Sequence, residues 1–98
     1  MEELLCQAIE NRKLISFAYD GYYREVEPFT LGVHKDTDNL SLSAWWVGGH
    51  SHSRSYPHWR LYTVDLMSDI TILNRSASSY QDGYNPNDKR MRRIICTA

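Results

Sequence analysis

Aromatic and basic side chains alternate along a stretch of the chain that carries no acid. Between Asp38 and Asp65 there is no Asp or Glu, while large rings, guanidinium groups and imidazoles occur at Trp45, Trp46, His50, His52, Arg54, Tyr56, His58, Trp59, Arg60 and Tyr62. Flat rings stack on nucleobases, and the planar guanidinium fork grips phosphate. A stretch without carboxylates also suits an anion, because nothing within it repels negative charge. This pattern indicates a site for a nucleotide or a similar anionic ligand.

The same rings could instead fill the core, because large aromatic residues dominate small cores too. Side chains of a strand point alternately to its two faces. By this alternation Trp46 shares a face with Leu40 and Leu42, so we expect it in the core. Trp45 shares a face with serines and is the better candidate for a ligand contact.

The residues after these tryptophans could complete such a site. Gly48 and Gly49 lack the Cβ that would keep a ligand away from the backbone, although a glycine pair is equally typical of an ordinary strand-ending turn. Ser51 and Ser53 carry hydroxyl groups that could hydrogen-bond to the edges of a ligand. We therefore include these four residues among the candidate ligand-binding residues.

No pattern typical of catalysis or of metal binding accompanies them. His50 and His52 would point the same way in an extended loop, but the sequence offers no third ligand at a diagnostic spacing, and metal sites within one chain normally need three or four. No serine lies in a nucleophile elbow, and the glycine pair lacks the Gly-Lys-Ser/Thr of a phosphate-binding loop. We expect a protein that is not an enzyme, with no catalytic residue, metal or cofactor.

Length and composition indicate one soluble domain. The 98 residues are 42% hydrophobic, and no apolar run is long enough to span a bilayer. The first residues are acidic where a signal peptide would be basic, so we expect a cytoplasmic location and no membrane partner. A Cys6–Cys96 disulfide is possible, but in a reducing cytosol two free cysteines are the expected state. Residues 1–38 carry eight acids and four Lys or Arg, whereas residues 39–98 carry four acids and seven Lys or Arg.

One helix and five strands must position these residues. Leu4, Leu5, Ala8 and Ile9 recur at helical spacing and predict a helix over residues 2–12. Alternation and turn residues predict strands over 14–19, 23–33, 40–47, 59–66 and 70–73, with a hairpin turn at 20–21 and an edge or bend at Pro28. Such a chain predicts a strongly bent antiparallel sheet or a partly closed barrel, with the helix over one open end. From residue 74 the periodicity is lost, and the basic run Lys89–Arg93 is expected to be a solvated tail.

Several segments, taken in order, resemble the WYL domain family. They are the helix Leu5–Ile9, Ile15-Ser-Phe-Ala-Tyr19, Arg24-Glu-Val-Glu-Pro-Phe-Thr-Leu31, Leu42-Ser-Ala-Trp-Trp-Val-Gly-Gly49 and Trp59-Arg-Leu-Tyr-Thr-Val-Asp65. The resemblance covers residues 4–73, and residues 80–91 are similar to the tail of short, free-standing WYL-like proteins. It implies an α+β fold in which an N-terminal helix precedes a five-stranded antiparallel Sm-like barrel. The whole chain, 1–98, would be a single domain with its core at about 2–73 and a C-terminal extension at 74–98.

The resemblance also implies a function. WYL domains usually follow a DNA-binding helix-turn-helix in bacterial regulators, are thought to sense nucleic acids or nucleotides, and recur in phage defence. Arg24 and Arg60 occupy positions that match basic residues of the family's ligand face. The namesake tripeptide is here Leu40-Ser41-Leu42, and two later basic positions are Thr63 and Leu66. These departures argue against a broad nucleic-acid groove and favour a smaller ligand.

Three functions are compatible with these features. The first is a binding module for a nucleotide or a short single-stranded nucleic acid, in which Arg24 and Arg60 contact phosphate and Trp45 and Trp59 stack. Without a helix-turn-helix, a second is a sponge of phage or mobile-element origin that sequesters a cyclic nucleotide or oligonucleotide immune signal and acts in counter-defence. The third is a structural or interaction subunit. The sponge in particular would be a homo-oligomer, to which Lys89–Arg93 could add a basic surface.

Overall fold

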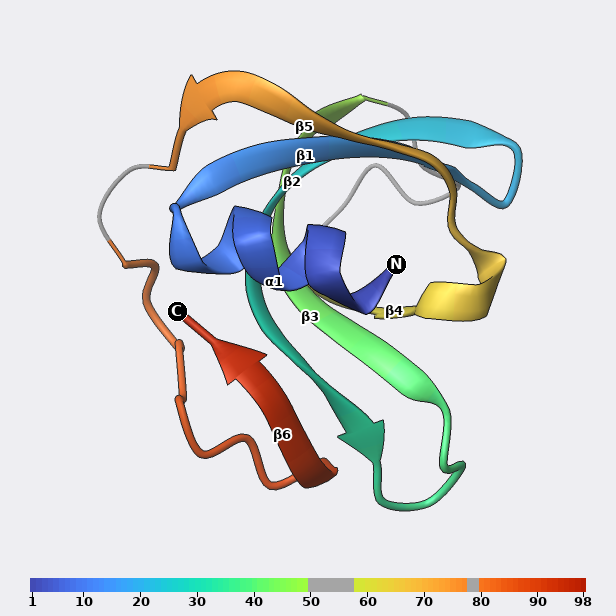
Figure 1. Cartoon of the computed structure of the whole chain (residues 1–98), viewed down its shortest axis with the longest axis vertical. Helices are drawn as coiled ribbons and strands as arrows, with labels where there is room; N and C mark the ends of the chain where they lie inside the picture. Colours follow the sequence, from blue (N-terminus) through green and yellow to red (C-terminus); the bar gives the residue numbers. More distant parts are fainter. Residues whose placement is uncertain (50–57, 78–79) are drawn as a thin grey trace.

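The computed structural model of the chain describes residues 1–49, 58–77 and 80–98. Within these ranges it has one N-terminal helix, six antiparallel strands and one short 3-10 turn (Figure 1). In chain order they are α1 (Glu2–Glu10), β1 (Lys13–Tyr19), β2 (Tyr22–His34), β3 (Leu40–Gly49), β4 (Trp59–Thr63), η1 (Val64–Leu66), β5 (Ser68–Ser76) and β6 (Met91–Thr97). The predicted α+β class is confirmed.

The strands form one bent, open sheet. Their order is β4-β3-β2-β1-β5, and β6 lies off this path and pairs with β2. The prediction of five strands is therefore wrong, because residues 91–97, expected to belong to an extension without periodicity, add the sixth. Met91 and Cys96 of β6 are buried. The described part of the chain thus uses its C-terminal residues to widen the sheet.

Pro28 marks the point where β2 changes its neighbour. β1 pairs with the first half of β2, as far as Val26, whereas β6 pairs with the second half, from Thr30 onward. Proline has no backbone N–H to give to a ladder, and the register between β2 and β3 shifts between Pro28 and Thr30. The interruption of the ladder predicted at this proline is confirmed, since Pro28 pairs with β3 but with neither β1 nor β6.

The turn between β1 and β2 also agrees with the sequence. Asp20 and Gly21 have φ angles of 53° and 77°. A two-residue hairpin turn of type I′ requires positive φ at both central residues, and the Asp-Gly pair tolerates this well. The hairpin then sets the register that places Phe17 opposite Arg24.

Helix α1 covers the inner face of the sheet (Figure 1). Its residues Leu5, Ala8 and Ile9 are completely buried. They pack with the inward-pointing side chains of the strands, which are Ile15, Phe17, Val26, Leu31, Leu42, Ala44, Tyr62, Val64, Met67 and Cys96. None of the helices in the described residues is long and apolar enough to cross a membrane.

A disulfide joins α1 to β6. Cys6 and Cys96 are bonded, with their Cα atoms 5.8 Å apart. The sequence favoured two free cysteines on the ground of a reducing compartment, and that expectation is wrong for this structure. The reason lies in the unpredicted strand: β6 brings Cys96 back against the helix.

The gap between β1 and β4 is bridged by a side chain. These strands are not neighbours in the sheet, yet the backbone N–H of Thr63 donates to the hydroxyl oxygen of Tyr19 over 3.1 Å. The curvature of the sheet therefore brings its two halves within reach of one another at this end.

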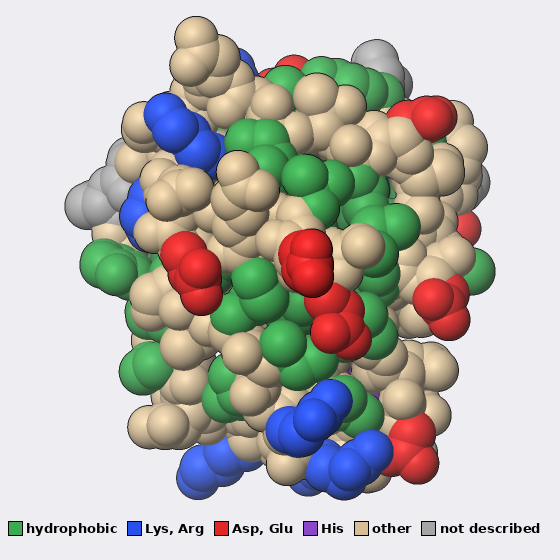
Figure 2. Space-filling view, in the orientation of Figure 1, with side chains coloured by type: hydrophobic (Ala, Val, Ile, Leu, Met, Phe, Trp, Pro, Cys, Tyr) green, Lys and Arg blue, Asp and Glu red, His purple; other side chains and the backbone are tan. Residues whose placement is uncertain are grey.

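Charges are distributed unevenly over the surface. In the space-filling view, carboxylates lie over α1, while Lys and Arg side chains gather at the lower edge, near the start of β6 (Figure 2). At least one basic group of this region is paired, since Arg92 Nε lies 3.0 Å from the Asp38 carboxylate. The acidic helix face is not a surface that would attract an anion.

Candidate functional site

The pairing of β3 with β4 divides the predicted site residues between the two faces of the sheet. Trp45 pairs with Trp59, and Ala44 pairs with Arg60. Because successive residues of a strand face opposite ways, Arg60 points to the inner face and Trp59 to the outer face. Arg24 also lies on the inner face. The two arginines are thus brought together, whereas the two tryptophans expected to act with them lie on the opposite side.

The inner face carries a group of five residues that we call the arginine cluster: Tyr19, Arg24, Trp46, Arg60 and Tyr62. The guanidinium carbon of Arg24 lies 5.3 Å from the ring centroid of Tyr19 and 5.7 Å from that of Tyr62. The guanidinium carbon of Arg60 lies 5.3 Å from the Trp46 ring. Both arginines therefore stack on rings, and cation–π contacts hold their planar groups in place.

Arg24 is unusually deep for a charged residue. It is only 4% exposed, and its Nη2 donates to the backbone oxygen of Tyr19 over 3.3 Å. Among the residues that the structure describes, no carboxylate forms an ion pair with it. A buried charge without a counter-ion is costly, so its presence calls for an explanation.

Three buried polar atoms of the arginine cluster make no hydrogen bond within the described ranges. They are Arg24 Nε, Trp46 Nε1 and the Tyr62 hydroxyl. The first two can only donate. Burial raises the pKa of Tyr62, and the nearby guanidinium groups of Arg24 and Arg60 offset part of this rise. Arg24 therefore lies beside the hydroxyl oxygen, and the phenol keeps its proton to donate. Each such unmet donor costs about 1–3 kcal/mol, so the arginine cluster carries donors for which the described residues supply no acceptor.

Sequence reasoning missed three members of this cluster. Tyr19 was assigned only to a strand, Tyr62 was noted among the rings of the acid-free stretch but not chosen as a site residue, and Trp46 was assigned to the core. Trp46 does pack against the core cluster, as predicted, but it also lies under Arg60. The signal was present: Arg60 and Tyr62 are two residues apart, so they had to share a face.

Trp59 and Trp45 lie on the outer face in a second aromatic group. Trp59 packs against the fully buried Phe29, with ring centroids 4.9 Å apart, and its Nε1 donates to the Asp82 backbone oxygen over 2.7 Å. Trp45 stacks on His58 at 4.9 Å. Trp59 therefore helps to hold residues after 80 against the sheet, which is a packing role that the sequence did not predict.

The glycine pair at the end of β3 has a structural explanation. Gly49 has a φ of 88°, and a Cβ there would overlap the Tyr23 carbonyl oxygen and lie 2.9 Å from Arg24 Cα. The close approach at Gly49 is thus made by β2 of the same chain. At Gly48 the nearest atom to a Cβ would be a Glu25 carboxylate oxygen at 3.7 Å. Ser51 and Ser53 lie outside the described residues.

Replacing Gly49 by alanine is expected to lower the free energy of unfolding by at least about 1 kcal/mol, because the new Cβ meets backbone and the φ is left-handed. Gly48→Ala is the matched control and is expected to change it by less than about 0.5 kcal/mol. Urea unfolding of both variants measures the difference. Equal stabilities would contradict this account of the pair.

An ion pair within the segment before β6 holds Arg90, which in turn hydrogen-bonds to Ser43 on the outer face. Arg90 Nη2 lies 2.6 Å from one Asp88 carboxylate oxygen, Arg90 Nε lies 3.0 Å from the other, and Nη2 also donates to Ser43 Oγ over 3.3 Å. The side-chain hydrogen bonds from Arg90 lower the pKa of Asp88 and raise that of Arg90. Both shifts favour the charged pair at neutral pH.

The lowered pKa of Asp88 makes stability depend on pH. In the unfolded chain an aspartate has a pKa of about 4. The stabilisation that the charged Asp88 gives the fold is therefore fully present above that pH, and it is lost as the pH falls through the lower pKa of the folded state. Asp88→Asn should therefore cost about 1 kcal/mol at neutral pH and almost nothing in strong acid. Urea midpoints at both pH values test this, with Asp65→Asn at an exposed position as the control. A cost independent of pH would show that the charge of Asp88 does not matter.

Comparisons of the chain with family models, with curated proteins and with solved structures returned no match. Among residues 1–49, 58–77 and 80–98, no three His, Cys, Asp or Glu side chains are grouped so that they could hold a metal ion. His50 and His52 lie outside these ranges. The arginine cluster is therefore the candidate functional site on its geometry alone.

Proposed function

We propose that this protein is a non-enzymatic binding module for a nucleotide or a short nucleic-acid-type anion, which the arginine cluster holds. The observation that carries the proposal is the group of unmet donors: Arg24 Nε, Trp46 Nε1 and the Tyr62 hydroxyl, all buried. Phosphate oxygens are acceptors, carry negative charge and would satisfy these donors together. Charge-assisted hydrogen bonds of this kind are about twice as strong as neutral ones.

The depth of Arg24 favours a small ligand over a long polymer. A protein that binds nucleic acid along an open groove contacts the backbone with accessible cations, whereas Arg24 is 4% exposed. One phosphate that reaches into the cluster would meet Arg24, and Arg60 with the Trp46 ring would border the rest of the ligand. Arg60 lies over the Trp46 ring, and guanidinium and indole groups are both types that stack with bases.

We also propose a more specific description of the fold. The bent sheet, the helix over its inner face and the Tyr19–Thr63 hydrogen bond support a partly closed barrel of Sm-like form. The likeness to WYL domains is proposed on the sequence segments given above, and Arg24 and Arg60, the two residues it matches to the family's ligand face, both belong to the arginine cluster. The preference for a small ligand also suits a sponge for a cyclic nucleotide, which would act as a homo-oligomer.

The proposed location is the cytoplasm, where nucleotides are available. Thiol buffers keep most cysteine pairs reduced there. The Cys6–Cys96 bond would then be open for much of the time, so the fold has to persist with both thiols free.

Titration followed by proton–nitrogen correlation NMR tests the function. The probes are AMP, ATP, a cyclic dinucleotide, a short oligonucleotide and pyrophosphate, each added to the intact chain. We expect at least one to shift the Trp46 indole N–H signal, and Arg60→Gln to weaken that probe about tenfold or more. Arg92→Gln is the control, because Arg92 is an exposed arginine on β6 that pairs with Asp38.

Each outcome of this titration bears on the proposal. If no probe moves the Trp46 signal of folded protein, the anion site is wrong. If only the oligonucleotide binds, with affinity that rises with its length, the small-ligand reading fails. Phosphorus NMR of the same samples records any cleavage of the nucleotide, and cleavage that Arg60→Gln abolishes would contradict a non-enzymatic role.

A further inference from the structure

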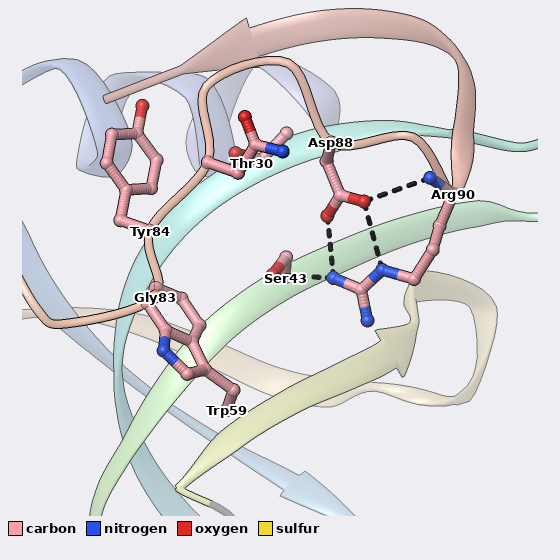
Figure 3. Close-up of a pocket in the computed structure, with 8 residues that line it drawn as sticks. Thr30, Ser43, Trp59, Gly83, Tyr84, Asp88 and Arg90 are labelled. Atoms are coloured by element: carbon pink, nitrogen blue, oxygen red, sulfur yellow. Dashed lines mark hydrogen bonds and ion pairs between the residues drawn. The ribbon is translucent and has the colours of Figure 1, made fainter.

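The outer face of the sheet has a hollow that the arginine cluster does not share. Its volume is about 320 Å³, and its lining includes Thr30, Ser43, Trp59, Tyr84, Asp88 and Arg90. Figure 3 shows these side chains between the ribbon of the sheet and the segment that leads into β6. Ser43 and Trp59 alternate with the inward-facing Leu42 and Arg60, so the hollow opens on the side opposite to the arginine cluster.

The charges in the hollow cancel one another. Asp88 and Arg90 form an ion pair whose closest atoms are 2.6 Å apart, and Asp88 also accepts from the backbone N–H of Arg90 over 3.0 Å. A ligand with net charge would gain little from such a wall, because attraction to one partner is offset by repulsion from the other. The pair still offers carboxylate acceptors and guanidinium donors side by side.

The remaining walls are rings and hydroxyl groups held in fixed positions. Tyr84 donates to the Ala98 backbone oxygen over 2.5 Å, and the Thr30 hydroxyl bonds that of Thr97 at 2.9 Å. Gly83 lies so close to Trp59 that a Cβ there would sit 3.0 Å from the indole nitrogen. Walls fixed in advance in this way lose little freedom when a ligand binds.

We propose that this hollow binds a neutral, hydroxyl-rich ring, such as a monosaccharide. Sugar hydroxyls donate and accept at once, and Asp88, Arg90 and Ser43 present both kinds of partner. The C–H groups of a sugar ring pack on aromatic side chains, and Trp59 and Tyr84 both line the hollow. Small-molecule sites occupy about 300–1,000 Å³, so the hollow is of a size for a single ring.

The indole N–H signals of the tryptophans make the test specific to one face. D-glucose, D-galactose and D-ribose are titrated separately into the full chain, with inorganic phosphate as the anionic comparison. We expect at least one sugar to bind with a millimolar Kd and to shift the Trp59 indole signal while the Trp46 signal stays in place. Phosphate is expected to leave the Trp59 signal unmoved. This result is independent of whether nucleotides bind the inner face.

Two variants test whether the sugar that shifts the Trp59 signal contacts Arg90 and Ser43. Arg90→Gln should weaken the sugar about tenfold, and Ser43→Ala, which removes only one oxygen, should weaken it a few-fold if Arg90→Gln does not fold. Arg92→Gln is the matched control and should bind as the parent does. The proposal is overturned if no sugar shifts the Trp59 signal at tens of millimolar, if phosphate shifts it and sugars do not, or if the affinity is the same in all variants.

Discussion

Replacing Arg24 by methionine should stabilise the free protein and abolish nucleotide binding in the same variant. Arg24 is buried over the rings of Tyr19 and Tyr62, with one backbone acceptor for its guanidinium group. Methionine has a similar length and no charge to desolvate. Exchange of buried ionic groups for apolar ones has stabilised proteins by about 1–4 kcal/mol, and we expect a gain in this range. Urea unfolding and the nucleotide titration measure the two effects.

A gain in stability together with a loss of nucleotide binding would identify Arg24 as a residue that serves ligand binding and not the stability of the fold. Arg92→Met, on the exposed part of β6, should change neither stability nor binding by much. If Arg24→Met unfolds more easily than the parent, then Arg24 serves the fold through its ring contacts and not a ligand. If the variant binds nucleotide as well as the parent does, Arg24 is not part of the site.

Opening the disulfide is expected to have the largest effect on stability. Cys6 and Cys96 are 90 positions apart, so the bond closes a loop that includes almost the whole chain. A cross-link over such a loop lowers the entropy of the unfolded chain by an amount worth about 4–5 kcal/mol in the chain-entropy treatment. Small domains have only about 5–15 kcal/mol in total. The oxidised protein should therefore unfold at a clearly higher urea concentration than the reduced protein.

The double variant Cys6→Ser, Cys96→Ser separates the loss of the disulfide from any other effect of the reductant on stability. It should match the reduced parent, and dithiothreitol should not change it further. The buried residues Leu5, Ala8 and Ile9 should still hold α1 on the sheet, so its circular dichroism is expected to stay close to that of the parent. Identical urea midpoints for the oxidised and reduced parent would contradict a stabilising role for the bond.

The elements that could be predicted are those with uninterrupted patterns. Leu42, Ala44 and Trp46 face the core at every second position of β3, as alternation requires. β6 could not be predicted this way, because its two buried residues, Met91 and Cys96, are five positions apart. The register between β2 and β6 shifts twice, between Leu31 and Gly32 and between Val33 and His34. Each shift breaks the two-residue period on which such predictions rest.

The candidate site was predictable in part. Arg24 and Arg60 both lie on the inner face, but Trp59 could not share that face, since it precedes Arg60 directly. What the sequence could not indicate is the partner of Trp59 on the outer face. Residues after 80 are polar and rich in turn residues, yet Tyr84 of this segment packs on Phe29 at 5.1 Å. Such long-range contacts leave no local pattern.

The hydrogen bond from the Thr63 N–H to the Tyr19 hydroxyl gives the protein a built-in reporter of slow opening. The amide hydrogen of Thr63 is shielded from solvent through a side chain on a strand that is not its neighbour. Its exchange with deuterium therefore reports how readily the two halves of the sheet separate at this end. Tyr19 also lies beneath Arg24. A ligand that fixes Arg24 should slow that exchange, while the amides of the Asp20–Gly21 turn continue to exchange at an unchanged rate.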